Sequence, residues 1–282
     1  MAELSRDDQS SASGRAGRNL ASAIVVGLLL GFGLVLLPIV LAPWIFSFVV
    51  AFAMVGGAHE LHGAMASRGI RLVRLPLYIG VFAMVEVAYW YGPLPFLAVF
   101  AATVLLSCGL RLRRGPDGFV ADVAATVFAA SYTGLLGGFA ALTLASSQGG
   151  GRVLTFVILT ICSDVGGYAA GVLAGRHPIA PSLSPKKSWE GFVGSLLLQA
   201  IAGVLLFTLL LHAPWWQGLI TGLVLTVTAT VGDFVESAVK RDLGVKDMSS
   251  VLPGHGGLMD RFDSLLPNAF ASWLLLRVFL GP

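Results

Sequence analysis

Long, nearly uninterrupted runs of apolar residues constrain this chain more than any other feature of its sequence. The hydrocarbon core of a bilayer is crossed by a helix of about 20 mostly apolar residues. Nine runs of this kind follow one another along the 282 residues: Leu20–Leu41, Trp44–Ala66, Leu75–Tyr91, Leu94–Leu110, Ala121–Ala145, Val153–Ala174, Gly191–Leu211, Trp215–Glu236 and Ser264–Gly281. We therefore expect an all-α, polytopic membrane protein with about nine transmembrane helices.

The composition excludes the other broad classes. Only 12% of the residues are charged and 56% are hydrophobic, whereas a soluble domain carries about 25% charged residues. A disordered chain would need low hydrophobicity and high charge. Cys108 and Cys162 both lie in apolar runs, so no disulfide framework is expected. The net charge of +3 is small and gives no reason to expect a nucleic-acid partner.

The basic residues predict how the chain is oriented. If the nine spans alternate, 16 of the 18 Lys and Arg residues fall on one side of the membrane, which is then the cytoplasmic side. Aromatic residues such as Trp44, Trp90 and Trp215 fall at the opposite boundary, as in an aromatic belt. We expect a cytoplasmic N-terminus and a C-terminus outside.

The chain divides into two unequal parts. Residues 1–19 are polar and are expected to form a disordered cytoplasmic tail. Residues 20–282 are expected to form a single transmembrane domain, whose first run is too long for a signal peptide. Glycines recur four positions apart, at Gly134 and Gly138 and at Gly218 and Gly222. We interpret this spacing as close helix packing.

Few ionisable residues occur within the first half of the membrane domain. His59, Glu60 and His62 have the spacing H-E-x-H, which does not match the H-E-x-x-H zinc helix. We interpret them as a hydrogen-bonded cluster at the end of a span rather than as a metal site. Glu86 lies within the third span, where a carboxylate is costly, and the sequence indicates no partner for it.

Polar residues are far denser in the second half and gather at the cytoplasmic side. Asp164 lies in the sixth span, and a polar insertion from Ser184 to Gly191 precedes the seventh. At helical spacing, residues 233, 236, 237 and 240 share one face. The positive-inside rule explains the lysines and arginines, but it does not explain the acids Asp164, Asp233, Glu236, Asp260 and Asp263.

This combination of acids, bases and glycines indicates a particular chemistry. Carboxylates at a membrane face need cations or a metal. Carboxylate oxygens bind Mg²⁺, which also bridges phosphate oxygens. Backbone N–H groups near Gly254–Gly257 can form an anion-binding nest. The residues therefore predict a site for phosphate groups and hard divalent cations.

The same residues carry a longer pattern. It runs S-x-x-K-R-x₄-K-D, then a short spacer, then [PG]-x-H-G-G-x-x-D-R-x-D, and every fixed position is matched between Ser237 and Asp263. In this pattern the sequence resembles the phosphatidate cytidylyltransferases. The close resemblance covers residues 162–266 and includes the element from Ser184 to Gly191. It departs from the family only in Ser188, where Thr is usual, and Gly167, where Ala is usual.

The resemblance implies an enzyme that uses CTP and phosphatidic acid and requires Mg²⁺. Its products are CDP-diacylglycerol, for phospholipid biosynthesis, and pyrophosphate. Because the phosphate of the lipid is itself the nucleophile, no covalent protein intermediate is needed. Catalysis then depends on positioning and on neutralising negative charge. Phosphatidic acid enters from the membrane, so we expect a cavity open both to the cytosol and to the inner leaflet.

The resemblance also implies roles for individual residues. We expect Asp233 and Asp260 to bind the metal, with Asp263 or Asp164 completing its coordination. With Lys240 and Arg261, Asp233 and Asp260 form the expected catalytic set. Asp247 is expected to orient a base. The expected substrate-binding residues are Ser184, Lys186, Lys187, Ser237, Lys240, Arg241, Lys246, His255, Gly256, Gly257 and Arg261.

Three other functions make different demands on the sequence or on the products. The D-G-x-x-A-R…G-x-x-x-D-x-x-x-D motif of CDP-alcohol phosphotransferases is absent. A CTP-dependent lipid or polyprenol kinase would release CDP instead of pyrophosphate. An ion-coupled transporter would also contain intramembrane carboxylates, although its polar residues would be spread over repeated halves. The expected location is a bacterial inner membrane with the site facing the cytoplasm, and the glycine-lined helices also suit a homodimer.

Overall fold

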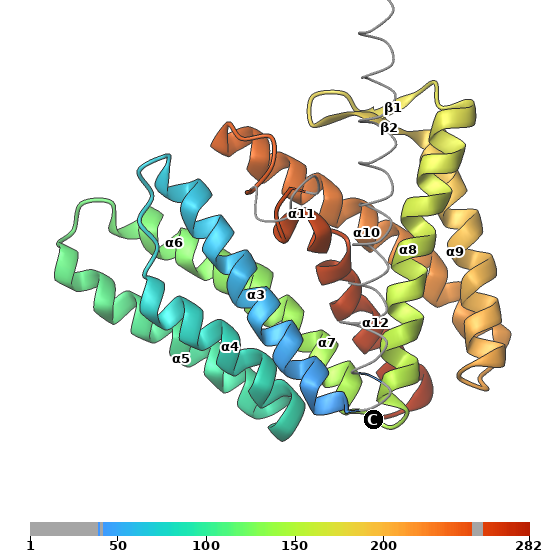
Figure 1. Cartoon of the computed structure of the whole chain (residues 1–282), viewed down its shortest axis with the longest axis horizontal. Helices are drawn as coiled ribbons and strands as arrows, with labels where there is room; N and C mark the ends of the chain where they lie inside the picture. The colour runs from blue at the N-terminus through green and yellow to red at the C-terminus, as the bar shows by residue number, and fades with distance from the viewer. Residues whose placement is uncertain (1–38, 40–41, 250–255) are drawn as a thin grey trace, which may run out of the picture.

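The computed structural model describes residue 39, residues 42–249 and residues 256–282. The expected tail, nearly all of the first expected span and His255 of the signature lie outside the described residues. Every other expected span corresponds to a helix in the structure (Figure 1).

The first group of helices runs from α3 to α7. It comprises α3 (Pro43–Ala66), α4 (Arg74–Tyr91), α5 (Pro93–Arg111), the 3-10 turn η2 (Leu112–Arg114), α6 (Phe119–Ala129), the π-helical η3 (Ala130–Leu135) and α7 (Leu136–Ala145). Proline opens both α3 and α5, where its missing N–H costs nothing. Gly92 separates α4 from α5 with a φ of 82°, a conformation that favours glycine.

The second group contains the long helices α8 (Gly149–Ala174), α9 (Trp189–Leu209) and α10 (Trp215–Leu243). The short α11 (Met259–Phe262) and α12 (Leu265–Leu280) complete it. In Figure 1, α12 lies between this group and the first. The helix α10 extends seven residues beyond the expected end at Glu236, so Ser237, Lys240 and Arg241 belong to the same helix as Asp233.

Six described helices are long and apolar enough to cross a membrane: α3, α5, the continuous run from α6 to α7, α8, α9 and α10. The helices α4 and α12 correspond to two further expected spans but fall short of the same measure of length and apolar composition. The structure is that of a multi-pass membrane protein built from helices.

One small sheet adds to the expected all-α architecture. The strands β1 (Pro178–Ala180) and β2 (Ser184–Ser188) pair antiparallel, with Pro178 opposite Ser188 and Ala180 opposite Ser184. They form the polar insertion before α9, which the sequence places outside the spans without indicating its structure. A side-chain oxygen of Ser188 then caps α9 by accepting a hydrogen bond from the Gly191 backbone N–H at 3.1 Å.

Glycines allow the long helices to approach one another closely. A Cβ atom on Gly166 of α8 would lie 2.6 Å from the carbonyl oxygen of Gly194 on α9. Gly203 of α9 meets Gly218 of α10 in the same manner. The interpretation of the recurring glycines at Gly218 and Gly222 as packing residues is therefore confirmed.

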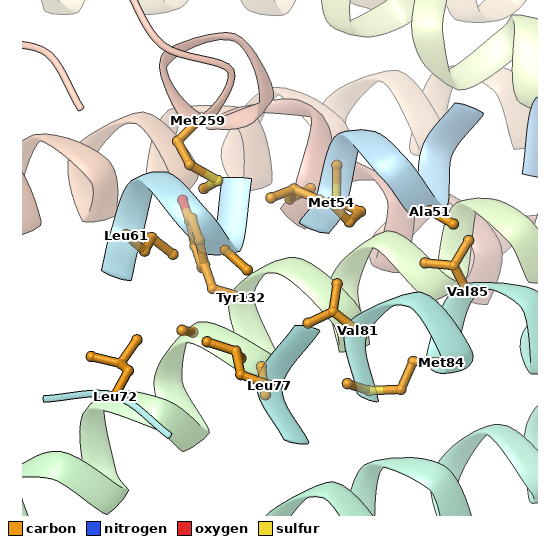
Figure 2. Packing of buried hydrophobic residues seen from close by; sticks show 14 of the residues in the cluster. Ala51, Met54, Leu61, Leu72, Leu77, Val81, Met84, Val85, Tyr132 and Met259 are labelled. Atoms are coloured by element: carbon orange, nitrogen blue, oxygen red, sulfur yellow. The ribbon is translucent and has the colours of Figure 1, made fainter. Parts of the chain in front are cut away.

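Buried side chains hold the two groups together. Figure 2 shows the larger apolar cluster, in which Met259 of α11 packs beside Leu61 of α3 and Tyr132 of η3. A polar contact links three helices elsewhere in the core. The Asn268 amide of α12 donates to Thr160 Oγ1 of α8 at 2.8 Å, and its Oδ1 accepts from Thr228 of α10 at 2.5 Å.

Candidate active site

Several charged residues of the second half lie close together near the hairpin. A cavity of about 240 Å³ lies between α8, the hairpin, α9 and α10. Its polar lining consists of Ser163, Asp164, Tyr168, Lys186, Lys187, Ser188, Ser195, Thr230 and Asp233. The cavity thus brings the polar insertion to the acidic residues of α8 and α10.

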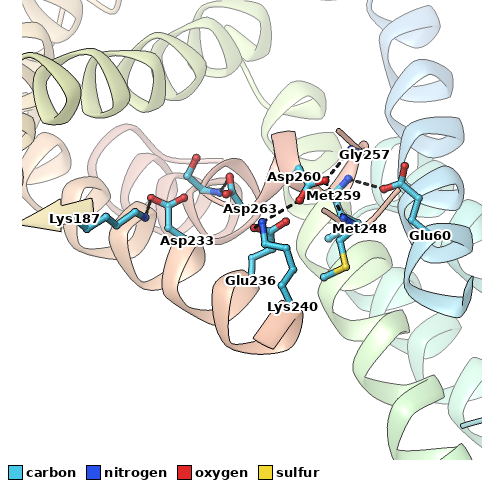
Figure 3. A network of polar contacts seen from close by, with 11 residues as sticks. Glu60, Lys187, Asp233, Glu236, Lys240, Met248, Gly257, Met259, Asp260 and Asp263 are labelled. Atoms are coloured by element: carbon cyan, nitrogen blue, oxygen red, sulfur yellow. Dashed lines mark hydrogen bonds and ion pairs between the residues drawn. The ribbon is translucent and has the colours of Figure 1, made fainter. Parts of the chain in front are cut away.

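An ion pair joins the hairpin to α10 at this cavity. Lys187 of β2 donates to the Asp233 carboxylate (Figure 3). The ammonium also lies 5.1 Å from the centre of the Phe234 ring, within reach of a cation–π interaction. Because 31% of the Lys187 side chain and 23% of the Asp233 side chain stay exposed, both groups can reach a molecule in the cavity.

A second charged group lies one turn further along α10. Lys240 Nζ donates to Glu236 Oε2 at 2.5 Å and to Asp260 Oδ1 at 2.9 Å. The Glu236 side chain is only 2% exposed. The expectation of a shared face on α10 is thus confirmed for Glu236 and Lys240, and Asp260 joins them from α11 (Figure 3).

Asp260 also orders the glycine segment before α11. Its Oδ2 accepts hydrogen bonds from the backbone N–H groups of Gly257 at 2.7 Å and Met248 at 3.0 Å. Burial acts to raise the pKa of the Asp260 carboxyl, but hydrogen bonds from Glu236, Gly257 and Lys240 outweigh it and hold that pKa below its usual value. Asp260 is therefore an anion that receives both backbone and side-chain donors.

The carboxyl group of Asp263 faces the opposite electrostatic situation. Burial, the charges of Asp233 and Glu236 and a hydrogen bond with Asp233 raise the pKa of Asp263 to about 8. Two carboxyl groups in hydrogen-bond contact must share a proton or a cation. In addition, Glu236 Oε1 is buried and has no hydrogen-bond partner among the described residues.

These observations bear on metal binding. In the part of the chain that the structure describes, no three His, Cys, Asp or Glu side chains are already arranged to hold a metal ion. The donor chemistry nevertheless fits a hard divalent cation, because the carboxyl pair and the unpartnered Glu236 oxygen supply oxygen ligands.

Glu60 belongs to this site, although its sequence context indicates only a polar cluster at the end of a span. From α3, its Oε1 accepts hydrogen bonds from the Leu258 backbone N–H at 2.8 Å and Ser249 Oγ at 2.6 Å. Its Oε2 accepts from the Met259 backbone N–H at 2.9 Å. No local pattern could connect residues nearly 200 positions apart. The costly placement of a carboxylate in an apolar run was the only signal.

Tyr132 is a second residue that the sequence does not indicate. It lies in the π-helical η3, and such interruptions of an α-helix are frequent at functional sites. Its hydroxyl is buried without a hydrogen-bond partner among the described residues, and it lies within electrostatic reach of Asp263, Glu236 and Asp233. This phenol is therefore a buried hydrogen-bond donor close to the carboxylates.

The remaining expected site residues divide into two sets. Asp164 lines the cavity, within electrostatic reach of Asp233, Lys187 and Arg261, and Lys186 lines it as well. Four others lie on segments that surround the site: Ser184 on β2, Ser237 on α10, and Gly256 and Gly257 just before α11.

Two expected substrate-binding residues, Arg241 and Lys246, do not take part in these contacts. Both are exposed, and within the described ranges neither forms an ion pair. Asp247 is likewise exposed.

Comparison with known proteins identifies a family and several relatives of this chain. Residues 21–279 match the model of a family described as the cytidylyltransferase family. A phosphatidate cytidylyltransferase of Mycobacterium leprae is 42% identical over 94% of this chain and 89% of its own length. The phosphatidate cytidylyltransferase of Mycobacterium bovis is 41% identical over 94% of this chain and 90% of its own length. That of Staphylococcus saprophyticus is 30% identical over 88% of this chain and 92% of its own length.

Proposed function

The chain belongs to the cytidylyltransferase family, and from this premise we propose how its polar cavity performs the reaction. The enzyme transfers the cytidylyl group of CTP to phosphatidic acid, which gives CDP-diacylglycerol and pyrophosphate. The observation that carries the site assignment is the Lys187–Asp233 ion pair, which closes the cavity between the hairpin and α10 beside Asp263.

The reaction joins two polyanions. A phosphate oxygen of phosphatidic acid attacks the α-phosphorus of CTP, and the bond from that phosphorus to the bridging oxygen of the β-phosphate breaks. The nucleophile is already ionised, so no general base is required of the protein. The protein must align the two substrates and offset their mutual repulsion, which are the usual contributions in phosphoryl chemistry.

The basic residues of the cavity supply that charge. Lys186 and Lys187 reach the cavity from β2, and Lys240 lies beside Asp260 on the other side of Asp233. We assign these three and Arg261 to phosphate groups of the substrates. The backbone N–H groups around Gly256 and Gly257, ordered by Asp260, are a further place for phosphate oxygens. The Tyr132 hydroxyl adds a neutral donor.

The carboxylates are assigned to Mg²⁺. Asp233 and Asp263 would hold the ion, with Asp164 from the cavity wall and Asp260 Oδ1 as further oxygen ligands. When bound, Mg²⁺ would neutralise phosphate charge and polarise the phosphate to be attacked. Lys187 and Lys240, which pair with Asp233 and Asp260, keep these carboxylates oriented toward the same place.

The lipid substrate also needs a hydrophobic approach. Tyr168 lines the cavity, and the neighbouring α8 side chains Val165 and Val172 are 54% and 67% exposed. We propose that the acyl chains lie against this flank of α8 while the phosphate enters the cavity. We further propose that the site faces the cytoplasm of a bacterial plasma membrane, because the basic loops surround it, and that nine spans cross the bilayer.

The product pattern tests this function against the kinase alternative. Purified protein in detergent is incubated with phosphatidic acid, Mg²⁺ and CTP labelled either at the α- or at the γ-phosphate. We expect the α-label in CDP-diacylglycerol and the γ-label in pyrophosphate. Transfer of the γ-label to lipid, with release of CDP, would contradict the proposal.

A further inference from the structure

A second cavity lies apart from the carboxylates, where α3 ends and α4 begins. It has a volume of about 610 Å³ and is lined by His62, Ala66, Gly69, Arg71, Leu72, Arg74 and Arg114. No residue of this lining takes part in the cytidylyltransferase site described above. Arg68, in the same α3–α4 connection, donates to the Leu243 carbonyl at the end of α10 at 2.9 Å. The second cavity therefore lies at the same end of the molecule as the active site.

The charge of this cavity is strongly positive. The side chains of Arg71, Arg74 and Arg114 are exposed, and of the residues that the structure describes, none places a carboxylate within ion-pair distance of them. Asp122, whose Oδ1 accepts the Arg71 backbone N–H at 2.7 Å, is already paired through Oδ2 with the buried Arg111, also at 2.7 Å. Within the described ranges, the three guanidinium groups thus carry more positive charge than Asp122, which is within electrostatic reach of Arg114 but already paired with Arg111, can offset.

His62 gives a second, independent indication of a ligand. The residue is only 7% exposed, lines the cavity, and its Nδ1 has no hydrogen-bond partner among the described residues. Buried polar atoms nearly always have a partner. The positive-inside rule accounts for arginines in membrane loops, but it does not account for a buried imidazole nitrogen on a residue that lines the cavity.

We propose that this cavity binds a phosphate-bearing anion. Guanidinium groups match the geometry of phosphate oxygens and can bind them in a bidentate manner, while the imidazole can contribute one further hydrogen bond. Two sources offer this chemistry at a membrane face, the headgroup of an anionic phospholipid and free phosphate. Basic pockets between transmembrane helices on the cytoplasmic side are suited to the first, and the experiment below separates the two.

The test uses the full-length protein and a matched pair of double variants. Arg74→Gln with Arg114→Gln removes two charges of the cavity, whereas Arg113→Gln with Arg176→Gln removes two exposed charges that do not line it. Binding of dioleoyl phosphatidylglycerol, with dioleoyl phosphatidylcholine as the reference lipid, is measured by native mass spectrometry. Binding of inorganic phosphate is measured by calorimetry.

We expect the cavity variant to bind the anion about 30-fold more weakly, because the loss of each Arg weakens binding by roughly five- to sixfold. The control variant should match the wild type. A loss confined to phosphatidylglycerol identifies the lipid headgroup, and a loss for inorganic phosphate identifies the free anion. Equal affinities of the cavity variant and the wild type for both probes would overturn the proposal.

Folding of the cavity variant is checked independently by its turnover of CTP and phosphatidic acid, since neither Arg74 nor Arg114 belongs to the catalytic site. Should that variant be inactive, Arg114→Gln alone at its exposed position provides the measurement, with an expected loss of about fivefold. An unchanged affinity in this single variant for both probes would also contradict the proposal.

Discussion

Glu60 of α3 binds the backbone of Met259 across 199 positions of sequence, with a distance of 2.9 Å from the Met259 N to Oε2. Its other oxygen binds the Leu258 N–H at 2.8 Å. These contacts fix the segment that leads into α11 against the first group of helices, immediately before Asp260. Glu60 thus joins the two halves of the chain at the site where phosphate groups are expected to bind.

Replacing Glu60 with Gln tests this role. The amide keeps one acceptor oxygen but presents an NH₂ group to the other backbone donor, so one buried N–H loses its partner. Hydrogen bonds to charged groups contribute about 1.5–3 kcal/mol. We therefore expect Glu60→Gln to lower turnover about tenfold or more, and hydrogen exchange at Leu258 and Met259 to become faster.

Glu86→Gln is the control, because Glu86 is also a carboxylate in an apolar helix but contacts Ser47 and Trp90 instead of the signature segment. We expect it to retain wild-type turnover. If Glu60→Gln and Glu86→Gln behaved alike, in turnover or in hydrogen exchange at Leu258 and Met259, Glu60 would have no specific positioning role.

Replacing Tyr132 with Phe should affect turnover without lowering the stability of the protein. Its buried hydroxyl has no partner among the described residues, so Tyr132→Phe removes an unsatisfied group and should leave the free energy of unfolding unchanged or slightly higher. If the hydroxyl donates to a bound phosphate, turnover falls about tenfold. Thermal unfolding and steady-state kinetics on the same preparation measure both effects.

Tyr78→Phe provides the comparison, because the Tyr78 hydroxyl lies 3.1 Å from His59 Nδ1 and outside the catalytic cavity. It should retain turnover. Wild-type turnover in Tyr132→Phe would show that the phenol does not assist the reaction.

Replacing Asn268 should affect the stability of the protein. Its side chain is fully buried and bridges Thr160 and Thr228 on two other helices. Hydrogen bonds between transmembrane helices contribute about 0.6 kcal/mol on average and up to about 1.7 kcal/mol. We expect Asn268→Leu to lower the free energy of unfolding by about 1–3 kcal/mol, measured by denaturant titration in detergent.

The matched control is Ser272→Ala, at an equally buried residue of α12 whose hydroxyl donates within its own helix, to the Ala269 carbonyl at 3.1 Å. Ser272→Ala should lower the free energy of unfolding by less than Asn268→Leu does. Equal losses in the two variants would show that the bridge between helices contributes nothing beyond a local hydrogen bond.

Local spacing accounts for what the sequence predicts correctly. Apolar runs of membrane length become helices, and the spacing of Asp233, Glu236 and Lys240 places them along one side of α10 because a helix repeats every 3.6 residues. The signature predicts that Asp260 and Asp263 lie near them. Helical periodicity and a dense motif are both local properties, which a single sequence contains in full.

Long-range contacts account for most of what the sequence does not reveal. The partners of Glu60 lie on the far half of the chain, and the role of Tyr132 depends on a π-helical turn that has no clear sequence signal. Arg241 and Lys246 match the signature, yet their side chains are exposed, because a motif specifies residue types without fixing which way their side chains face. The sequence does not predict the β-hairpin, because its strands are only three and five residues long.

The most direct test of the proposed active site is the rate of CDP-diacylglycerol formation by Asp233→Asn as Mg²⁺ is varied, compared with Asp117→Asn at an exposed loop position. The asparagine keeps the size of Asp233 but removes the charge that pairs with Lys187 and is assigned to the cation. We predict that Asp117→Asn matches the wild type and that Asp233→Asn, still folded, is slower by about 100-fold or more at every Mg²⁺ concentration. A rate for Asp233→Asn within about twofold of the wild type would contradict the assignment of the reaction to this cavity.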